Sequence, residues 1–211
     1  MTVEVFLTQL SSEPTLPTEE EAPHGSLRHF LLDMLETFGL AVVLFIAINM
    51  VSARVRVDGF SMLPTLQNNQ YVLVNRMVSH YQRGDIIVFR PPMYPREDFL
   101  RRLIGQPTLY EDYIKRVIGL PGDTVEVTGG KVLINGTPLD EPYIAQNPSY
   151  TGTWNVPQDY LFVLGDNRNN SSDSHSWGFL PIENVLGKAV LVYWPFTDWM
   201  ILRTPAALAA H

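Results

Sequence analysis

The sequence contains no cysteine, which excludes disulfide bonds, thiolate metal sites and a cysteine nucleophile. Lysine is scarce too, because Lys115, Lys131 and Lys188 are the only lysines among the 211 residues. No cluster of basic residues forms the electrostatic footprint of a nucleic-acid-binding protein. We therefore expect no nucleic-acid partner, and we also expect no metal ion and no other cofactor.

The formal net charge of −7 is unevenly distributed. Residues 1–23 contain five glutamates and neither lysine nor arginine, so the rest of the chain is close to neutral. Residues 1–26 also contain three prolines and bury too little apolar surface to offset the entropy of ordering. We predict a disordered acidic tail over 1–26, with a short strand at Val3–Leu7 as the alternative.

A long apolar run follows the tail. Residues 37–53 carry no charge, and a helix from Phe30 to Ala53 would be about 36 Å long at about 1.5 Å per residue. That length is enough to cross a hydrocarbon core of about 30 Å. We interpret residues 27–53 as a transmembrane anchor helix.

Two alternatives compete with the anchor. A buried core helix is one of them. The other is a cleaved signal peptide, because Val51-Ser52-Ala53 resembles a small-residue cleavage site. The segment before the run is long and acidic, however, whereas a signal peptide begins with a short basic segment.

Residues 54–203 show the pattern of an all-β domain. Gly129-Gly130 is a hairpin signal, turn residues recur at short spacing, and no long amphipathic helix is apparent. The predicted strands are Arg54–Val57, Tyr71–Val74, Asp85–Phe89, Tyr113–Ile118, Asp123–Val127, Lys131–Ile134, Leu161–Leu164 and Gly187–Trp194. We expect a mainly β fold of mixed antiparallel sheets or a partly open barrel, with a surface insertion at 91–112 and a frayed tail at 204–211.

Ser61 is the candidate nucleophile. It lies in Asp58-Gly59-Phe60-Ser61-Met62-Leu63-Pro64-Thr65-Leu66, between a glycine turn and a proline turn just past a predicted strand. Such a serine can expose its Oγ and offer its backbone N–H to an oxyanion. The alternative is a turn serine that only bonds to nearby backbone.

A serine nucleophile needs a base, and Lys115 is the candidate. We expect Lys131, after the Gly-Gly turn, and Lys188, at the start of a strand, to be exposed. Lys115 and Arg116 lie on opposite faces of a predicted strand, so one of them points toward the better-packed face. Burial there would lower the pKa of a lysine. The alternative is a structural lysine in an ion pair.

At this point the chain resembles type I signal peptidases, a family of Ser/Lys proteases. The resemblance covers the span and essentially all of residues 54–200. Four stretches match in order and spacing: Ser61–Leu66, Gly84–Phe89, Asp112–Asp123, and the segment Gly165-Asp166-Asn167-Arg168-Asn169-Asn170-Ser171-Ser172-Asp173-Ser174-His175-Ser176-Trp177-Gly178.

The resemblance implies a role for several residues. Ser61 would be the nucleophile and Lys115 the general base, with Ser171 hydrogen-bonding the neutral amine and Asp173 supporting it from behind. The positions that would line the substrate cleft are Val57, Met62, Leu66, Tyr113 and Ile114. The cleft would have shallow pockets for small side chains, and an extended substrate would pair with strand edges beside it.

The resemblance also implies a cellular setting. The protein would be a single-pass protein of a bacterial cytoplasmic membrane, with its catalytic domain on the extracytoplasmic side. It would remove signal peptides from preproteins at small-x-small sites, through an acyl-enzyme, near the secretion machinery. The basic residues do not fix this orientation: Arg28 precedes the span while Arg54 and Arg56 follow it, which weakly favours the opposite one.

The chain departs from the family pattern at two positions. Some members carry a serine two residues before the nucleophile that donates to the oxyanion, and here that position is Gly59. His175 stands where the pattern often has an arginine paired with the aspartate. An Asp173–His175 pair would depend on pH where an Asp–Arg pair does not.

Three other functions fit the residues in part. A Ser61-His175-Asp173 triad is permitted by residue type, although Asp173 and His175 are only two positions apart. A self-cleaving repressor-type Ser/Lys protein would need a DNA-binding half where this chain has an apolar span. A membrane-anchored β domain that only binds would predict loss of Ser61 or Lys115, and both are present.

Overall fold

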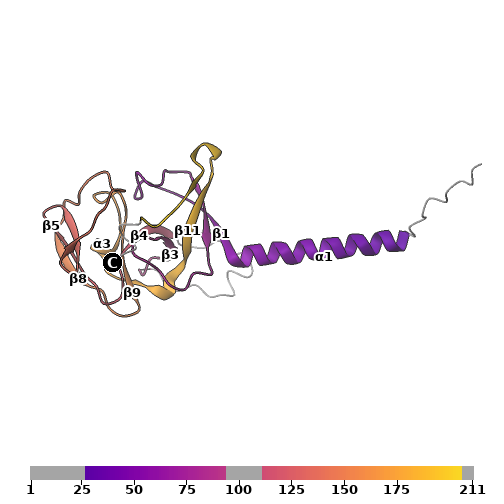
Figure 1. The fold of residues 1–211 in the computed structure, drawn as a ribbon, viewed down its shortest axis with the longest axis horizontal. Coiled ribbons are helices and arrows are strands. Elements are labelled where there is room, and N and C mark those ends of the chain that lie inside the picture. The colour runs from indigo at the N-terminus through magenta and orange to yellow at the C-terminus, as the bar shows by residue number, and fades with distance from the viewer. Residues whose placement is uncertain (1–26, 94–110, 206–211) are drawn as a thin grey trace, which may run out of the picture. The chain divides into compact units, whose positions relative to one another are not determined.

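The computed structural model describes residues 27–93 and 111–205. The predicted acidic tail, most of the predicted insertion at 91–112 and most of the tail at 204–211 lie outside the described residues. The helices are α1 (Leu27–Val51) and α3 (Ser174–Trp177), with single 3-10 turns at η1 (Ile182–Asn184) and η2 (Phe196–Asp198) (Figure 1). The strands are β1 (Ser52–Arg56), β2 (Tyr71–Asn75), β3 (Ile86–Phe89), β4 (Tyr113–Gly119), β5 (Thr124–Thr128), β6 (Lys131–Ile134), β7 (Thr137–Pro138), β8 (Gly152–Asn155), β9 (Tyr160–Leu164), β10 (Leu180–Pro181), β11 (Val185–Trp194) and β12 (Met200–Ile201).

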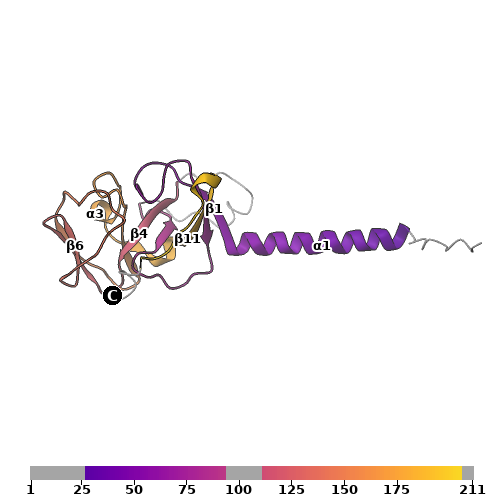
Figure 2. The same cartoon turned by 45° about the horizontal axis from the view of Figure 1, so that its top comes forward.

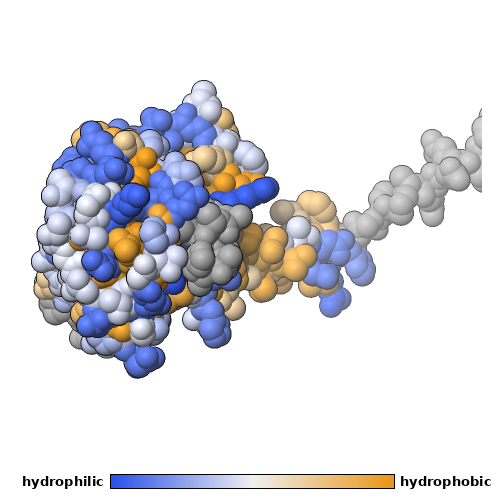
Figure 3. Space-filling view, turned by 60° about the vertical axis from the view of Figure 1, so that its left-hand side comes forward, coloured by the Kyte–Doolittle hydropathy of each residue, from blue (hydrophilic) through white to orange (hydrophobic). Residues whose placement is uncertain are grey.

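Helix α1 is apolar over most of its length. None of its 25 residues is buried. Apolar side chains cover most of its visible surface in Figure 3. At about 1.5 Å per residue it is about 38 Å long, and its length and composition are sufficient to cross a membrane.

The larger sheet has eight strands and carries the site. Its order is β1-β2-β11-β3-β4-β9-β10, β12 pairs with β11, and every pairing is antiparallel. Strand β11 is the longest, and its register shifts against both β2 and β3. Such bulges increase the local twist of a sheet and bend it. The sheet therefore curls into a half-barrel with β1 at one edge.

A smaller sheet of four strands lies beside the first, in the order β7-β6-β5-β8 (Figures 1 and 2). Its β5–β6 hairpin turns through Gly129 and Gly130, both with positive φ. A shared hydrophobic cluster joins the two sheets, in which Phe162 of β9 packs with Val125 and Val127 of β5. The smaller sheet thus packs against β4 and β9 of the larger sheet.

The expected mainly β fold behind one N-terminal apolar helix is confirmed, and the eight predicted strands are present within two residues of their predicted bounds. The strands that were not predicted are β7, β8, β10 and β12, which have at most four residues each. The expectation that Lys188 is exposed was wrong. Lys188 is half-buried, and its Nζ lies 2.6 Å from Oδ1 of the buried Asp85.

Replacing Phe162 with alanine tests the packing between the sheets. Phe162 is fully buried, so Phe162→Ala should lower the free energy of unfolding by about 3–5 kcal/mol. The exposed Phe196 is the matched control, and Phe196→Ala should change it by less than about 0.5 kcal/mol. Guanidinium titration of the detergent-solubilised protein, followed by tryptophan fluorescence, measures both. Equal effects would contradict the proposed packing.

Candidate active site

The turn after β1 fixes the position of Ser61. Gly59 adopts φ +94°, a conformation that favours glycine, and its N–H donates to Asn68 Oδ1 at 3.0 Å. The loop after β9 holds the turn from the other side, because Asn167 donates its backbone N–H to the Ser61 carbonyl at 3.0 Å and its Nδ2 to the Phe60 carbonyl at 3.1 Å. Ser61 is therefore held between two segments about a hundred residues apart in sequence.

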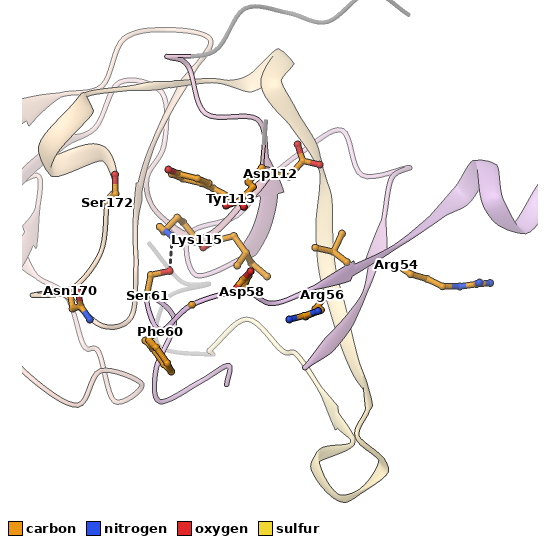
Figure 4. Close-up of a pocket in the computed structure, with 14 residues that line it drawn as sticks. Arg54, Arg56, Asp58, Phe60, Ser61, Asp112, Tyr113, Lys115, Asn170 and Ser172 are labelled. Atoms are coloured by element: carbon orange, nitrogen blue, oxygen red, sulfur yellow. Dashed lines mark hydrogen bonds between the residues drawn. The ribbon is translucent and has the colours of Figure 1, made fainter. Parts of the chain in front are cut away.

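Strand β4 brings Lys115 to the serine. The strand lies between β3 and β9, and Lys115 is only 4% exposed. Its Nζ lies 2.7 Å from Ser61 Oγ, and it also donates to the Ile114 carbonyl at 3.0 Å (Figure 4). Arg116, on the opposite face, is equally buried. Both faces of β4 are thus packed. The sequence pattern had predicted only that one of the two faces would be better packed than the other.

Burial controls the charge of Lys115. Desolvation lowers the pKa of Lys115 from 10.5 to about 8, against the opposing pull of the Asp173 and Asp166 carboxylates. A neutral amine can accept the Ser61 hydroxyl proton, and the 2.7 Å contact is within hydrogen-bond reach for that transfer. The pair therefore has the geometry and the protonation balance of a nucleophile and its general base.

A second charged group stabilises the site, and sequence reasoning assigned it no role. Arg116 binds Asp166 through two hydrogen bonds of 2.8 and 2.6 Å. Thr65, four residues after Ser61, donates its hydroxyl to the same carboxylate at 2.5 Å. These contacts tie the Ser61 turn to the strand that carries Lys115. Each residue lies in a matching stretch, but only the folded chain shows that they meet.

Ser171 lies near the turn that carries Ser61, but its Oγ is buried with no hydrogen-bond partner among the described residues. The contact is made possible by Gly165, where a Cβ would overlap Ser171 Oγ and lie 2.5 Å from the Ser61 carbonyl oxygen. The structure brings Ser171 close to Ser61, whereas Lys115 Nζ donates to the Ile114 carbonyl. The predicted bond from Ser171 to Lys115 stays a prediction.

Asp173 is fully buried and caps α3. Its Oδ2 accepts the Gly165 N–H at 2.9 Å, and its Oδ1 lies 2.6 Å from His175 Nδ1. The predicted Asp173–His175 neighbours therefore form a pair. His175 does not line the cleft that contains Ser61.

A cleft of about 830 Å³ opens over Ser61 and Lys115. In Figure 4, Asn170 and Ser172 lie on one side of Ser61, while Arg54 and Arg56 lie on the other. Its lining residues are Arg54, Val55, Arg56, Asp58, Gly59, Phe60, Ser61, Glu111, Asp112, Tyr113, Ile114, Lys115, Asn170 and Ser172.

The five predicted substrate-binding residues divide into two groups. Tyr113 and Ile114 line the cleft. Val57, Met62 and Leu66 do not, because they are buried in the hydrophobic cluster that also contains Ile114. In the described part of the chain, no three histidine or acidic side chains gather as a metal-binding group.

The fold and the site define a curled antiparallel β domain that follows an N-terminal apolar helix and holds a buried lysine in contact with a half-buried serine. The family described as signal peptidase, peptidase S26, matches residues 31–194. Signal peptidase I of Leptolyngbya laminosa is 45% identical over 197 residues, covering 88% of this chain and 94% of that protein. Signal peptidase I S of Bacillus subtilis strain 168 is 36% identical over 190 residues, covering 82% and 94%.

A plant protein is similar as well. Thylakoidal processing peptidase 1 of Arabidopsis thaliana is 36% identical over 165 residues, covering 71% of this chain and 46% of that protein. From the family match and the bacterial relatives, the chain belongs to the signal peptidase family S26 and is a peptidase.

Gly165→Ala tests the close packing around Ser61. The added Cβ would overlap Ser171 and the Ser61 carbonyl, so we expect kcat to fall by about 10²-fold or more, as misplacement of reacting groups by about 1 Å does. Gly39→Ala is the control, because a Cβ there meets no atom within 4 Å. Steady-state cleavage of a signal-sequence peptide measures both. Normal turnover by Gly165→Ala would contradict the packing argument.

The pH dependence of kcat/KM tests the protonation state of Lys115. Only the neutral amine accepts a proton, so kcat/KM should rise with pH along a limb centred near pH 8, where the pKa of Lys115 lies. At pH 7 about one tenth of the molecules would be active. Lys131→Met, which removes an exposed lysine, should leave the limb in place. A limb near pH 6.5, the ordinary range of histidine, would argue against a lysine base.

Proposed function

We propose that the protein is a membrane-anchored serine endopeptidase that removes signal peptides from preproteins, with Ser61 as nucleophile and Lys115 as general base. The observation that carries the proposal is the 2.7 Å contact between Lys115 Nζ and Ser61 Oγ at the base of an open cleft. Burial of the amine supports it, because it lowers the pKa of Lys115 to about 8. The family match supplies the substrate class.

The chemistry proceeds in two halves. Ser61 Oγ attacks the scissile carbonyl carbon while its proton passes to Lys115 Nζ. The resulting ammonium then donates that proton to the leaving amine as the C–N bond breaks, which leaves an ester on Ser61. Water attacks the ester, gives a proton to Lys115, and the proton returns to Ser61 Oγ as the acid leaves. Lys115 therefore serves both halves and ends neutral.

The oxyanion formed in each half needs donors. The Ser61 N–H lies at the start of the turn and supplies one. Gly59 offers no hydroxyl where some members of the family have a serine. A backbone group or a water molecule would have to supply the second donor, because loss of one donor costs about 10²–10³ in rate.

Two strand edges flank the cleft and suit an extended substrate. Strand β1 is the edge of the larger sheet, and β4 pairs with β9 only from Arg116 onward. Among the described residues, the backbone of Tyr113–Lys115 therefore pairs with no strand on that side. A peptide that added between these edges would gain main-chain hydrogen bonds. As the family resemblance implies, shallow pockets in the cleft would admit small side chains, which would favour small-x-small sites.

Helix α1 would anchor the enzyme in the lipid bilayer near the secretion machinery. We propose that it lies in the cytoplasmic membrane of a bacterium, because the relatives at 45% and 36% identity are bacterial signal peptidases. We also propose that residues 54–203 lie on the extracytoplasmic side, as the family resemblance implies. A thylakoidal peptidase is also among the relatives. Membrane fractionation followed by protease protection in spheroplasts distinguishes these membranes and orientations.

The Ser61-His175-Asp173 triad is the second candidate, and the contacts disfavour it. His175 Nδ1 is bound to Asp173 at 2.6 Å, as in a triad. The ring, however, stacks on Tyr150 with centroids 4.1 Å apart, and His175 is not part of the cleft lining. Lys115 occupies the place of the base beside Ser61 Oγ.

Cleavage of a preprotein by the detergent-solubilised protein at pH 10 tests the assignment. Ser61→Ala and Lys115→Met should each lower kcat/KM by at least about 10³-fold, while His175→Ala keeps most of the activity. Ser79→Ala and Lys131→Met, which lie outside the cleft, are the matched controls and should cleave normally. Activity in Lys115→Met together with loss in His175→Ala would replace the dyad with the triad.

A further inference from the structure

The segment between β7 and β8 reaches from the smaller sheet to the loop after β9. It lies outside the four stretches that resemble signal peptidases, and sequence reasoning assigned none of its residues a role. Ser149 donates its N–H to Asn169 Oδ1 at 2.8 Å, and Asn169 Nδ2 donates to the Asn147 carbonyl at 3.0 Å. The same loop after β9 holds the turn that carries Ser61. The smaller sheet therefore has a direct connection to the active site.

Glu141 lies at the start of this segment and binds a buried arginine of the loop. Its side chain is only 6% exposed, and its two carboxylate oxygens accept from Arg168 Nη1 and Nη2 at 2.8 and 2.6 Å. Arg168 donates its Nε to the Gly165 carbonyl at 3.1 Å. A paired arginine and carboxylate fix both distance and orientation. The Gly165 carbonyl is thereby tied to Glu141.

Tyr143 extends the contact to a second arginine. Its hydroxyl donates to Glu141 Oε1 at 2.8 Å. The guanidinium carbon of Arg116 lies 4.0 Å from the centroid of the Tyr143 ring, within the range of a cation–π contact. Arg116 in turn binds Asp166 of the loop after β9. One short segment of the chain thus contacts both arginines that hold this loop.

The loop residues that these arginines bind are the ones that fix Ser61. A Cβ at Gly165 would lie 2.5 Å from the Ser61 carbonyl oxygen, so the two segments are in close contact there. The Asp166 carboxylate accepts the Thr65 hydroxyl, and Asn167 donates its N–H to the Ser61 carbonyl at 3.0 Å. Displacement of the two arginines would therefore displace the Ser61 turn relative to β4.

Arg83 and Asp123 form a comparable buried ion pair at the end of β4. Arg83 donates to the Asp123 carboxylate at 3.0 Å and to the Ile118 carbonyl at 2.6 Å, and Asp123 accepts the Leu120 N–H at 2.6 Å. These bonds fix the end of β4 and the turn that follows, and none of them reaches the loop that holds Ser61. This pair is therefore a matched control for a purely structural role.

We propose that Glu141 is a positioning residue for the cleavage reaction: together with Tyr143 it holds Arg168 and Arg116, and through them the loop that fixes Ser61 beside the base. The proposal rests on the Ser61–Lys115 dyad of the preceding section. Glu141 does not line the cleft, so it acts on the geometry of the reacting groups and not on the substrate. Its loss should lower kcat with little change in KM.

Steady-state cleavage of a signal-sequence peptide by the full-length protein in detergent tests the proposal. Glu141→Gln leaves Arg168 buried without its counter-charge and should lower kcat about tenfold or more, because small displacements of reacting groups are costly. KM should stay within about twofold. The acidic limb of kcat/KM should stay near pH 8, because the carboxylates that act on the pKa of Lys115 are Asp173 and Asp166.

The midpoint of guanidinium unfolding, measured on the same variants, separates positioning from stability. Glu141→Gln and the control Asp123→Asn should both lower the midpoint, because each leaves a buried arginine without its partner. The control should keep the kcat of wild type. Glu141→Leu combined with Arg168→Met removes both charges, so the midpoint should recover. Its kcat should stay low, because the hydrogen bond to Gly165 is still missing.

Two results would overturn the proposal. One is a normal kcat in Glu141→Gln, and the other is a double variant in which kcat recovers together with the midpoint, since Glu141 would then serve stability alone. Ser61→Ala, measured alongside, separates this failure from a failure of the proposed function. Cleavage by Ser61→Ala would refute the dyad itself. Loss of cleavage in Ser61→Ala with a normal kcat in Glu141→Gln would refute only the positioning role.

Discussion

The site depends on one constraint, the placement of a lysine amine in a packed sheet with a serine hydroxyl 2.7 Å away. An exposed lysine is protonated at neutral pH and cannot act as a base. Here desolvation lowers the pKa of Lys115 to about 8, and each unit of that shift corresponds to about 1.4 kcal/mol. The rest of the fold must supply this energy and hold the serine turn in register with β4.

Much of the surrounding structure limits the negative charge around the amine. Asp166 would favour an ammonium at Lys115, but Arg116, on the opposite face of the same strand, binds it through two hydrogen bonds. The same carboxylate accepts the Thr65 hydroxyl, so compensating the charge also fixes the turn that carries Ser61. Buried charges are tolerated in proteins when they are paired and hydrogen-bonded. In this site, pairing also compensates a carboxylate that would otherwise favour the charged form of Lys115.

The sequence predicted the strands well because the long ones alternate or run apolar between glycine and proline turns. It missed β7, β10 and β12, which have only two residues each, because so short a strand is defined by its partner and leaves no periodicity in the sequence. Local pattern also identified Ser61 and Lys115 as candidates. Their roles came from a family resemblance. The two residues are 54 positions apart in the sequence, and the periodicity of a strand does not predict which distant residues lie next to it in the fold.

Other parts of the site could not be read from the sequence for physical reasons. The Thr65–Asp166–Arg116 contacts join three separate segments, and only the curl of the sheet brings them together. Lys188 was expected at the surface, yet it binds the buried Asp85. The prediction failed because the sequence does not give the register of β11 against β3, which brings Lys188 to Asp85. Val57, Met62 and Leu66 lie in the hydrophobic core and do not line the cleft. Their residue types do not show how deeply the turn around Ser61 buries each side chain.

Because the chain has no cysteine, the central claim can be tested by changing a single atom of the base. Lys115→Cys should be inactive, and alkylation of the new thiol with bromoethylamine should rebuild a lysine-like amine with a sulfur in its chain. The sulfur lowers the proton affinity of the amine, so activity should return with the acidic limb of kcat/KM at lower pH than in wild type. Failure to regain activity, or a restored limb that does not move, would contradict Lys115 as the general base.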